Sequence, residues 1–322
     1  MAQLMWLSSQ EILELVDTNS LNSTVEDTIR YHGQGLTSLP SETSVSWDAD
    51  SFHITKIGAV RPLNVVGIKW LTTYRNNPNS GLPLYYAVMV LNDGPTGAPL
   101  SVMDGRLISD IRTGSVSAVA AKYLARNDSR TIGMIGAGNQ ARSHLNAMAS
   151  IFSLSSVKVY DKNLDAMRTF ISENQSRFTN LSFEECSGAK EAAKDTDIIV
   201  VATIDNKPVF SADWVQDGSC IIGITGFRDL DPKLRHRADR FFVDDRSNAL
   251  RLIRTNYGRL DIDENEVTGE IGEVVAGKVT GRTKESDVTL FTPTGLGIVD
   301  VAVAKLAFDR ARNTGRGVWV DL

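Results

Sequence analysis

One short glycine-rich stretch constrains the fold more than any other part of the chain. The apolar residues 132–135 are followed at once by Gly136-Ala137-Gly138-Asn139-Gln140-Ala141, which has the G-x-G-x-x-A spacing of a phosphate-binding turn between a strand and a helix. Gly136 would permit a tight turn, Gly138 would let the backbone approach a pyrophosphate, and Ala141 would keep the helix close to the strand. This stretch predicts strand, turn and helix, with the helix N-terminus facing phosphate groups.

The next predicted strand supplies a carboxylate at the position that such a fold uses for the cofactor ribose. Residues 157–160 are apolar enough for a strand and end at Asp161, on the order of 20 residues beyond the glycines. A carboxylate there can bind the ribose 2′-hydroxyl, so we predict a Rossmann domain that binds NAD through Asp161 and through Asn139 and Gln140 at the helix start. Arg142 and Lys162 lie nearby and keep NADP possible.

Two further apolar runs extend this domain. Residues 197–202 and 219–224 are short and almost wholly apolar, as is typical of strands buried on both faces of a parallel sheet. From residue 130 to about 292, strands alternate with helices, which predicts an α/β fold with a doubly wound parallel sheet. Because ligands bind at the carboxyl edge of such a sheet, we expect Thr203, Thr225 and Gly226 to face the cofactor.

The segments on either side predict a second domain of α+β type. The first 35 residues look helical, with one helix capped by Ser8 or Ser9 and another over about 23–32, and strands are expected at 43–47, 52–57, 65–71 and 85–91. A helix beginning near Arg112 joins the two domains, and a last helix over 298–312 returns to the first. We therefore assign 1–126 with 298–322 to a substrate-binding and dimerisation domain, and 127–297 to the Rossmann domain.

Composition excludes several classes of function. The chain has 322 residues, 42% of them hydrophobic and 23% charged, with a net charge of −5 and no basic tract, so it offers no electrostatic basis for binding nucleic acid. No apolar run approaches the roughly 18 residues of a membrane helix. The first residues lack the features of a signal peptide, so a cytoplasmic protein is expected. Cys186, Cys220 and four histidines show no metal-ligand spacing, and no metal is expected.

Several longer motifs run through nearly the whole chain. They are Gly67-Ile-Lys-Trp70, Val90-Leu-Asn-Asp93 with Thr96-Gly-Ala-Pro-Leu100, Met103-Asp-Gly105, Arg112-Thr-Gly114 with Ala120-Ala-Lys-Tyr-Leu124, Ile135-Gly-Ala-Gly-Asn-Gln-Ala141, Gly272-Glu-Val-Val-Ala-Gly277, Leu290-Phe-Thr-Pro-Thr-Gly-Leu296 and Val318-Trp-Val-Asp-Leu322. With these motifs the chain resembles the ornithine cyclodeaminase/mu-crystallin family, whose members include cyclodeaminases, alanine dehydrogenases and ketimine reductases. The resemblance implies a homodimer in which the sheet of the first domain pairs with a second subunit.

The resemblance also implies a site for an amino or imino acid. Lys69 matches the family's substrate lysine, and Arg112 matches its carboxylate-binding arginine, whose guanidinium offers two parallel hydrogen bonds. Thr113 is expected to contact the cofactor, and Asp300, near the start of the last helix, is expected beside the nicotinamide. Without the resemblance, Lys69 reads as an exposed strand lysine, Arg112 as a surface helix residue and Asp300 as a partner of the helix dipole.

The chain departs from the family pattern in two places. Glu42 stands where the family usually has a cation, and Lys56 stands where cyclodeaminases have a glutamate, so these charges look exchanged. The pair either binds substrate in a new arrangement or is a solvated cross-strand pair. In the loop after Ile224, cyclodeaminases carry a catalytic aspartate, whereas the nearest carboxylate here is Asp229.

These observations favour an NAD(H)-dependent oxidoreductase that reduces an imino acid to an L-amino acid, or catalyses the reverse. Two alternatives stay open. One is a cyclodeaminase, or an enzyme that condenses two amino acids, with NAD recycled internally. The other is a non-catalytic small-molecule binder, against which the intact Lys69 and Arg112 argue.

Overall fold

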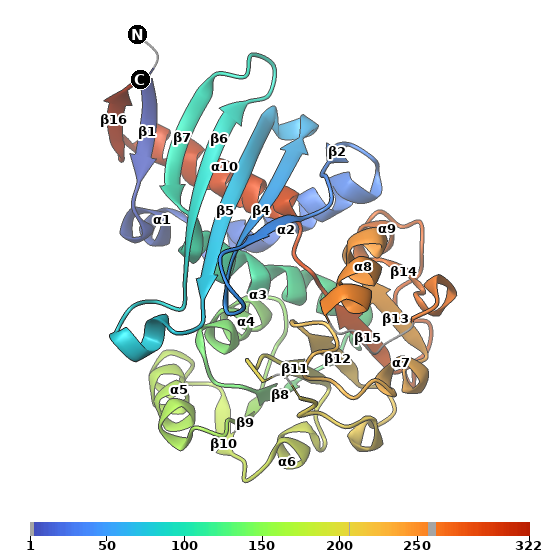
Figure 1. Ribbon diagram of the computed structural model, residues 1–322. Helices are drawn as coiled ribbons and strands as arrows, with labels where there is room; N and C mark the ends of the chain where they lie inside the picture. Colours follow the sequence, from blue (N-terminus) through green and yellow to red (C-terminus); the bar gives the residue numbers. More distant parts are fainter. Residues whose placement is uncertain (1–2, 206, 257–261) are drawn as a thin grey trace. The chain divides into compact units, whose positions relative to one another are not determined.

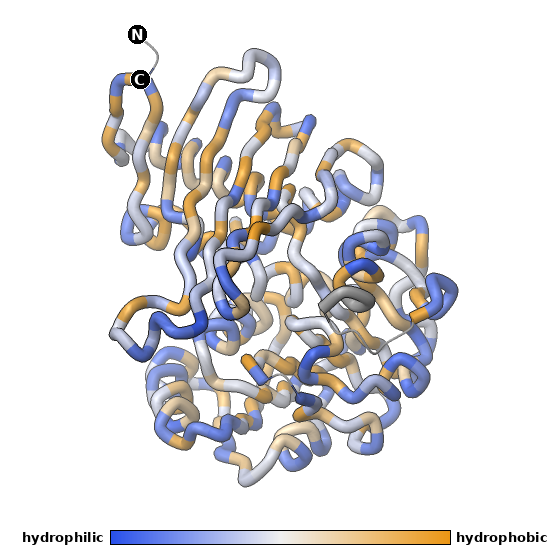
Figure 2. Tube along the Cα trace, in the orientation of Figure 1, coloured by the Kyte–Doolittle hydropathy of each residue, from blue (hydrophilic) through white to orange (hydrophobic). Residues whose placement is uncertain are grey.

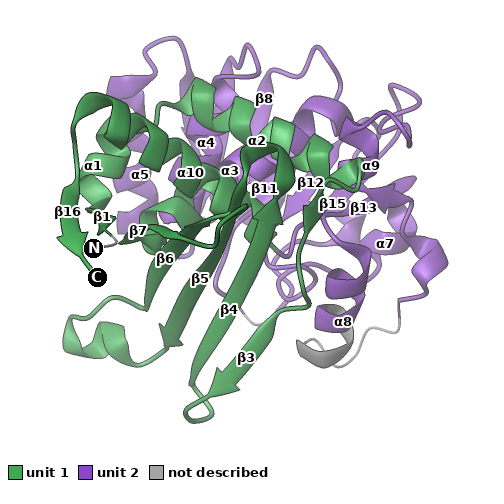
Figure 3. Cartoon of the chain, turned by 90° about the horizontal axis from the view of Figure 1, so that it is seen from above, with its two compact units in different colours: residues 1–112, 295–322 green, residues 113–294 purple. Residues whose placement is uncertain are grey.

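The computed structural model describes residues 3–205, 207–256 and 262–322, and the chain forms two compact units (Figure 3). Unit 1 comprises residues 1–112 and 295–322, and unit 2 comprises residues 113–294. The first boundary falls inside helix α3 (Gly105–Leu124), whereas the boundary expected from the sequence, after residue 126, lies beyond that helix. The part of α3 from Thr113 onward belongs to unit 2 because it packs closely against other residues of that unit. A Cβ atom on Gly114, for example, would lie 2.4 Å from the backbone of Ser143.

Unit 1 is built on a sheet in the order β16-β1-β7-β6-β5-β4-β2, with β3 also paired to β4. The β1/β7 pair is parallel and the other pairs are antiparallel. Hydrophobic residues recur along its strands (Figure 2). The strands are β1 (Gln3–Leu7), β2 (Thr37–Ser38), β3 (Thr43–Ser46), β4 (Ser51–Val60), β5 (Val65–Tyr74), β6 (Tyr85–Asp93), β7 (Pro99–Asp104) and β16 (Val318–Asp321).

Strands β3 to β6 confirm the four strands predicted from the sequence, but the expectation of a wholly helical N-terminal region was wrong. Residues Gln3–Leu7 form β1 because they pair with β7 on one side and with β16 on the other, which no local pattern reveals. Helix α1 (Ser9–Leu15) follows and is capped by Ser8 in a capping box with Glu11. Helix α2 (Thr18–Gly33) begins earlier than predicted because the Asp17 side chain caps it.

Helix α10 (Gly297–Thr314) lies against the sheet of unit 1 and packs on β4, β5 and β6 (Figure 1). A pair of glycines that face each other across β4 and β5, Gly58 and Gly67, makes this approach possible. A Cβ atom on Gly58 would lie 2.6 Å from Ile298 N, and one on Gly67 would lie 3.0 Å from a methyl group of Val301. The first turn of α10, which contains Asp300, is therefore held directly against the two strands.

Unit 2 confirms the doubly wound prediction. Its sheet is parallel throughout, in the order β10-β9-β8-β11-β12-β15-β13-β14, and the chain order reverses between β8 and β11, which makes a topological switch point. Its strands are β8 (Thr131–Ile135), β9 (Ser156–Tyr160), β10 (Ser182–Glu185), β11 (Ile198–Val201), β12 (Cys220–Gly223), β13 (Arg240–Val243), β14 (Gly269–Glu270) and β15 (Thr289–Thr292).

The helices of unit 2 cover this sheet, and a core of buried aliphatic and aromatic side chains fills the space beneath them, among them Ile199, Ile221, Phe241 and Leu290. The helices are α4 (Asn139–Ala149), α5 (Leu164–Arg177), α6 (Ala189–Ala193), α7 (Leu234–Arg237), α8 (Arg246–Asn256) and α9 (Ile271–Val275). In the part of the chain that the structure describes, no helix is long and apolar enough to cross a membrane.

We predict that Gly58→Ala destabilises the protein by about 1–3 kcal/mol, because the added methyl group would push α10 away from β4. Urea denaturation should show the loss. Thr55→Ala, on the opposite face of β4, is the control and should change stability by less than about 0.5 kcal/mol. A Gly58→Ala protein as stable as this control would contradict the proposed role of the glycine pair.

Candidate functional site

A buried cluster of charges lies in unit 1. Lys69 Nζ and Arg112 Nε each donate a hydrogen bond of 2.8 Å to the same oxygen of Asp300, Oδ1. Lys69 and Asp300 are completely buried, and Arg112 nearly so. Lys69 Nζ also donates to Ser109 Oγ at 3.1 Å. The second oxygen of Asp300, Oδ2, is buried and has no hydrogen-bond partner among the described residues.

Three elements bring this cluster together. Lys69 lies on β5, on the face that also carries Gly67, and Asp300 comes from the first turn of α10. Arg112 lies in the middle of α3, so the expectation that it begins a helix was wrong. The helix begins at Gly105 instead, because Asp104 Oδ1 accepts a hydrogen bond of 2.8 Å from Leu107 N. Ser109 was not identified from the sequence, although its position three residues before Arg112 places both on one helix face.

Burial and neighbouring charges shift the proton affinities of the cluster. The pKa of Lys69 is lowered to about 7: desolvation is the largest cause, Asp300 opposes it, and the cations of Arg112 and Lys56 add to the lowering. Burial by itself would raise the pKa of Asp300, but the cations of Arg112 and Lys69 outweigh it and hold that pKa below its ordinary value. Asp300 thus stays ionised, while Lys69 can gain or lose a proton near neutral pH.

Lys56 and Glu42 form an ion pair beside this cluster. Lys56 lies directly opposite Lys69 in the register of β4 and β5, and its Nζ is 3.1 Å from Glu42 Oε2. The same Nζ donates to the Gly295 carbonyl at 2.8 Å. The two side chains are only 13% and 10% exposed. Glu42 directly precedes β3, and because Thr43 is registered with Thr55, the continued register of β3 and β4 places Glu42 opposite Lys56. The pair is thus cross-strand, but it is not solvated, so the expectation of a solvated pair was wrong.

The cations converge beside Gly295. A Cβ atom on this residue would lie 2.9 Å and 3.0 Å from the two Nη atoms of Arg112 and 3.1 Å from Lys56 Nζ. Gly295 also has a φ of +85°, which disfavours any side chain. When all groups are ionised, three cations (Lys56, Lys69, Arg112) stand against two carboxylates (Glu42, Asp300), so the cluster carries one positive charge in excess. Such a site suits a carboxylate.

The glycine-rich turn of unit 2 forms an open cradle. Gly136 has a φ of +104°, and a Cβ atom on it would lie 2.3 Å from the Ala202 carbonyl at the end of β11, so only glycine fits there. At Gly138 a Cβ atom would meet nothing within 4 Å, and this glycine caps α4 without a side-chain hydrogen bond. Asn139 and Gln140 begin the helix, followed by buried Ala141. The open space and the helix N-terminus, which has no side-chain cap, fit a pyrophosphate.

Asp161 is fixed at the end of β9. Its carboxylate accepts hydrogen bonds of 2.8 Å from the backbone N–H groups of Ala137, inside the glycine turn, and of Asn163. The two cations that kept NADP possible each pair with a carboxylate: Arg142 binds Glu173 at 2.7 Å, and Lys162 binds Asp205 at 2.7 Å. Because their charges are compensated, these neighbours favour NAD at this position.

Asp229 holds the predicted threonines in place. It is completely buried and accepts hydrogen bonds from Thr203 Oγ1, at 2.8 Å, and from Thr225 Oγ1, so it links the ends of β11 and β12. Burial raises the pKa of Asp229. With both oxygens committed to threonines, Asp229 is a poor substitute for the aspartate that cyclodeaminases carry in this loop.

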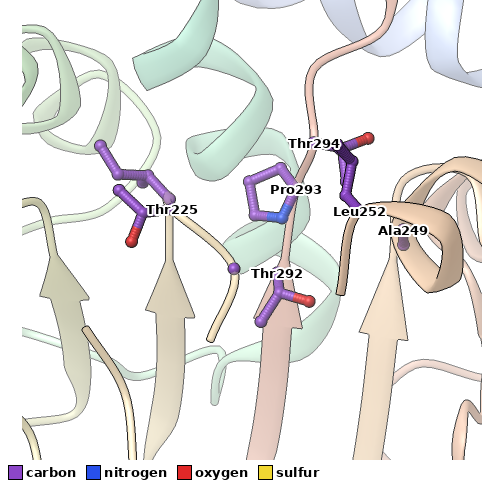
Figure 4. A pocket seen from close by; sticks show the side chains of 8 residues that line it. Thr225, Ala249, Leu252, Thr292, Pro293 and Thr294 are labelled. Carbon is purple, nitrogen blue, oxygen red and sulfur yellow. The ribbon is translucent and has the colours of Figure 1, made fainter. Parts of the chain in front are cut away.

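A pocket lies at the carboxyl ends of β12 and β15, beside α8 (Figure 4). It is lined by Ile224, Thr225, Gly226, Ala249, Leu252, Thr292, Pro293 and Thr294. Two of the predicted cofactor residues therefore reach this pocket, whereas Thr203 and Asp161 are outside its lining, and Thr113 is half-buried on α3.

Asp244, which was not identified from the sequence, holds Thr294 at one edge of this pocket. It is buried at the end of β13, and its carboxylate accepts hydrogen bonds of 2.8 Å from both the backbone N–H and the hydroxyl of Thr294. The signal that could have identified it is an acidic residue directly after the apolar run of β13.

Within the described ranges, no group of three or more His, Cys, Asp or Glu side chains is arranged so that it could hold a metal ion.

Comparison with known proteins identifies the family. The family model of the ornithine cyclodeaminase/mu-crystallin family matches residues 3–315. The chain belongs to this family. It is 33% identical over 317 residues to alanine dehydrogenase of Archaeoglobus fulgidus, covering 97% of this chain and 96% of that protein.

Two solved structures are similar over their whole length. One is the Thermococcus litoralis Δ(1)-pyrroline-2-carboxylate reductase in complex with NADH and L-proline, with a TM-score of 0.91, 31% identity and coverage of 98% of this chain and 99% of the other. The other is an archaeal alanine dehydrogenase dimer with bound NAD, with a TM-score of 0.91, 31% identity and coverage of 99% of both chains.

We predict that Asp161→Ser reduces or reverses a preference for NADH over NADPH, because the wild-type carboxylate would repel a 2′-phosphate. The ratio of kcat/KM values for the two cofactors measures this, and fluorescence titration of NADH and NADPH gives their Kd values independently of turnover. If the wild-type protein already binds NADPH at least as tightly as NADH, the role assigned to Asp161 is wrong.

Proposed function

We propose that this protein is an NAD(H)-dependent oxidoreductase that reduces an imino acid to an L-amino acid, or catalyses the reverse reaction. The observation that carries the proposal is the buried cluster of Lys69, Arg112 and Asp300, which combines an excess positive charge with a lysine that titrates near neutrality. Similar proteins of the family act on imino or amino acids and bind NADH or NAD.

Each residue of the cluster has a role in this proposal. Arg112 binds the substrate carboxylate with its two Nη groups, which approach Gly295, while its Nε is bonded to Asp300. Asp300 Oδ2, the buried oxygen that has no hydrogen-bond partner in the described part of the chain, accepts a hydrogen bond from the substrate nitrogen. Asp300 also keeps Lys69 within reach of the substrate, and Lys69 exchanges a proton with it.

The overall reaction is balanced as imino acid plus NADH plus a proton giving amino acid plus NAD. When bound, NADH would supply the hydride for the Cα of the protonated imine. The C=N π electrons then become the nitrogen lone pair, which takes the proton of the Lys69 ammonium group to give the ammonium form of the amino acid. Lys69 is reprotonated from solvent before the next turnover.

The cofactor is assigned to unit 2. We propose that the pyrophosphate binds at the glycine turn and the ribose hydroxyls at Asp161, and that the remaining contacts come from residues at the carboxyl edge of the sheet and on α3. The assigned residues are Thr113, Gly136, Gly138, Asn139, Gln140, Ala141, Asp161, Thr203, Thr225 and Gly226.

A reductase is favoured over a cyclodeaminase because the loop after β12 offers no uncommitted carboxylate, since Asp229 is bonded to Thr203 and Thr225. The deciding experiment is a screen of cyclic and acyclic imino acids for NADH oxidation, with ammonia release from L-ornithine measured in parallel. Stoichiometric NADH consumption supports the proposal. Ammonia release with no net change in NADH would establish the cyclodeaminase alternative instead.

We further propose that the protein is a cytoplasmic homodimer. The sheet face of unit 1 opposite α10 exposes large apolar side chains on neighbouring strands, including Ile57 on β4, Trp70 on β5, and Tyr86 and Val88 on β6. An exposed apolar patch of this kind suits a second copy of the chain, and the similar archaeal alanine dehydrogenase is a dimer. The cytoplasm is proposed because the reaction requires a pool of nicotinamide cofactor.

The pKa of Lys69 leads to a pH prediction. Because burial lowers this pKa to about 7, the proton donor is present below pH 7 and lost above it, so kcat/KM for imino acid reduction should fall as pH rises through about 7. Amino acid oxidation, which needs neutral Lys69, should rise over the same interval. The step should be absent in Lys69→Arg, whose side chain does not titrate in this range. A wild-type profile that is flat between pH 6 and 8.5, about 1–1.5 units on either side of the pKa, would rule out this proton transfer.

We predict that Arg112→Lys strongly lowers kcat/KM for the imino acid, by on the order of 100-fold, because an ammonium group cannot make two parallel hydrogen bonds to a carboxylate. Steady-state kinetics measure the loss, and NADH titration serves as the control, since the Kd for the cofactor should be unchanged. Unaltered substrate kinetics in this variant would exclude the assigned role.

A further inference from the structure

The Glu42–Lys56 pair determines how much charge the proposed substrate site presents. We propose that Glu42 is a specificity-determining residue, which neutralises Lys56 and thereby restricts the enzyme to imino acids with a single carboxylate and an uncharged side chain. This inference rests on the proposed function and defines its substrate class.

The pair borders the same space as the carboxylate-binding groups. Lys56 and Lys69 face each other across β4 and β5, and Lys56 Nζ lies beside Gly295, the residue that the Nη groups of Arg112 also approach. Lys56 cannot swing away easily, because it is bonded both to Glu42 Oε2 at 3.1 Å and to the Gly295 carbonyl at 2.8 Å. Its charge is therefore a fixed part of the site.

Because it is mostly buried, this pair has a larger electrostatic effect on neighbouring charges than a surface ion pair has. Its side chains are 13% and 10% exposed, whereas those of the Glu14–Arg316 pair, also in unit 1, are 42% and 46% exposed. Solvent screens exposed charges, and such pairs have little effect on their surroundings. The lower effective dielectric around Glu42 strengthens its effect on nearby charges, including those of a ligand.

The net charge of the ionised side chains around the site indicates how many carboxylates a substrate should carry. With Glu42, three cations minus two carboxylates leave +1, which one substrate carboxylate neutralises. Without Glu42, the same three cations minus Asp300 would leave +2, and Lys56 would be available to a second carboxylate. In the native protein a dicarboxylic imino acid would place its second carboxylate against Glu42, and this repulsion acts against such a substrate.

The experiment compares two substrates that differ by one carboxylate. NADH oxidation is measured with pyruvate plus ammonia, which forms the monocarboxylic imine, and with 2-oxoglutarate plus ammonia, which forms the dicarboxylic imine. The ratio of the two kcat/KM values should favour the monocarboxylate in the wild type. In Glu42→Gln it should shift toward the dicarboxylate by on the order of tenfold or more, equivalent to about 1.4 kcal/mol.

Matched variants separate this effect from a general disturbance. Glu14→Gln removes the carboxylate of the exposed pair and should leave the ratio unchanged. Adding Lys56→Gln to Glu42→Gln should abolish the shift, because the released cation is then absent. Glu42→Ser replaces Glu42→Gln if the latter is unstable, as judged by its thermal denaturation.

The outcomes distinguish this inference from the proposed function. If the wild type reduces the monocarboxylic imine but Glu42→Gln changes the ratio no more than Glu14→Gln does, or if the wild type prefers the dicarboxylic imine, the inference is wrong while the reductase assignment stands. If no imino acid is reduced, the reductase assignment fails. Calorimetric titration with L-alanine and L-glutamate then still tests the charge argument, which requires Glu42→Gln to gain affinity for glutamate alone and is overturned if it does not.

Discussion

Unit 1 depends on a single buried oxygen atom that two cations share. Asp300 Oδ1 accepts from both Lys69 and Arg112, and removing one member of a buried charged group typically costs about 3–5 kcal/mol because the others are left uncompensated. None of the three residues can therefore be changed alone without disturbing the rest. Among the described residues Asp300 Oδ2 has no hydrogen-bond partner, and three cations face two carboxylates in and beside this cluster. Burial lowers the pKa of Lys69, against the opposing effect of Asp300. The same three residues therefore stabilise unit 1 and provide the groups that the proposed reaction uses.

Glycines allow the close packing that sets the positions of these charged side chains. The facing pair Gly58 and Gly67 lets the backbone of α10 approach β4 and β5, and this approach sets the position of Asp300. Gly295 leaves room for Arg112 and Lys56 to converge. In unit 2, Gly136 admits the Ala202 carbonyl at the topological switch point. In each case the absent side chain provides space that the chemistry of the site requires.

The sequence predicts the parts of this protein that have local patterns. The spacing from Gly136 to Ala141 predicts the glycine turn, the apolar runs predict β11 and β12, and alternation predicts β4 to β6. Strands β1 and β16 escaped prediction because they are short and are stabilised by partners far away in sequence. For the same reason, motif matching found Lys69, Arg112 and Asp300 one by one, but nothing local in the sequence shows that they share one oxygen. Contacts such as Lys56 with Gly295 and Asp244 with Thr294 depend on the fold and become visible only with it.

The pairing of β1 with β16 has a consequence for the order of events during synthesis. Gln3 is registered against Asp321, so the sheet of unit 1 joins the first described residues to the last strand of the chain. Unit 2 is one continuous segment, 113–294, and can fold as soon as it leaves the ribosome. The N-terminal strands must wait for residues 295–322 to supply α10 and β16, and until then Lys69 has no Asp300 to pair with. The domain that is synthesised first is completed last, so its exposed strands are the part of the nascent chain most in need of protection from aggregation.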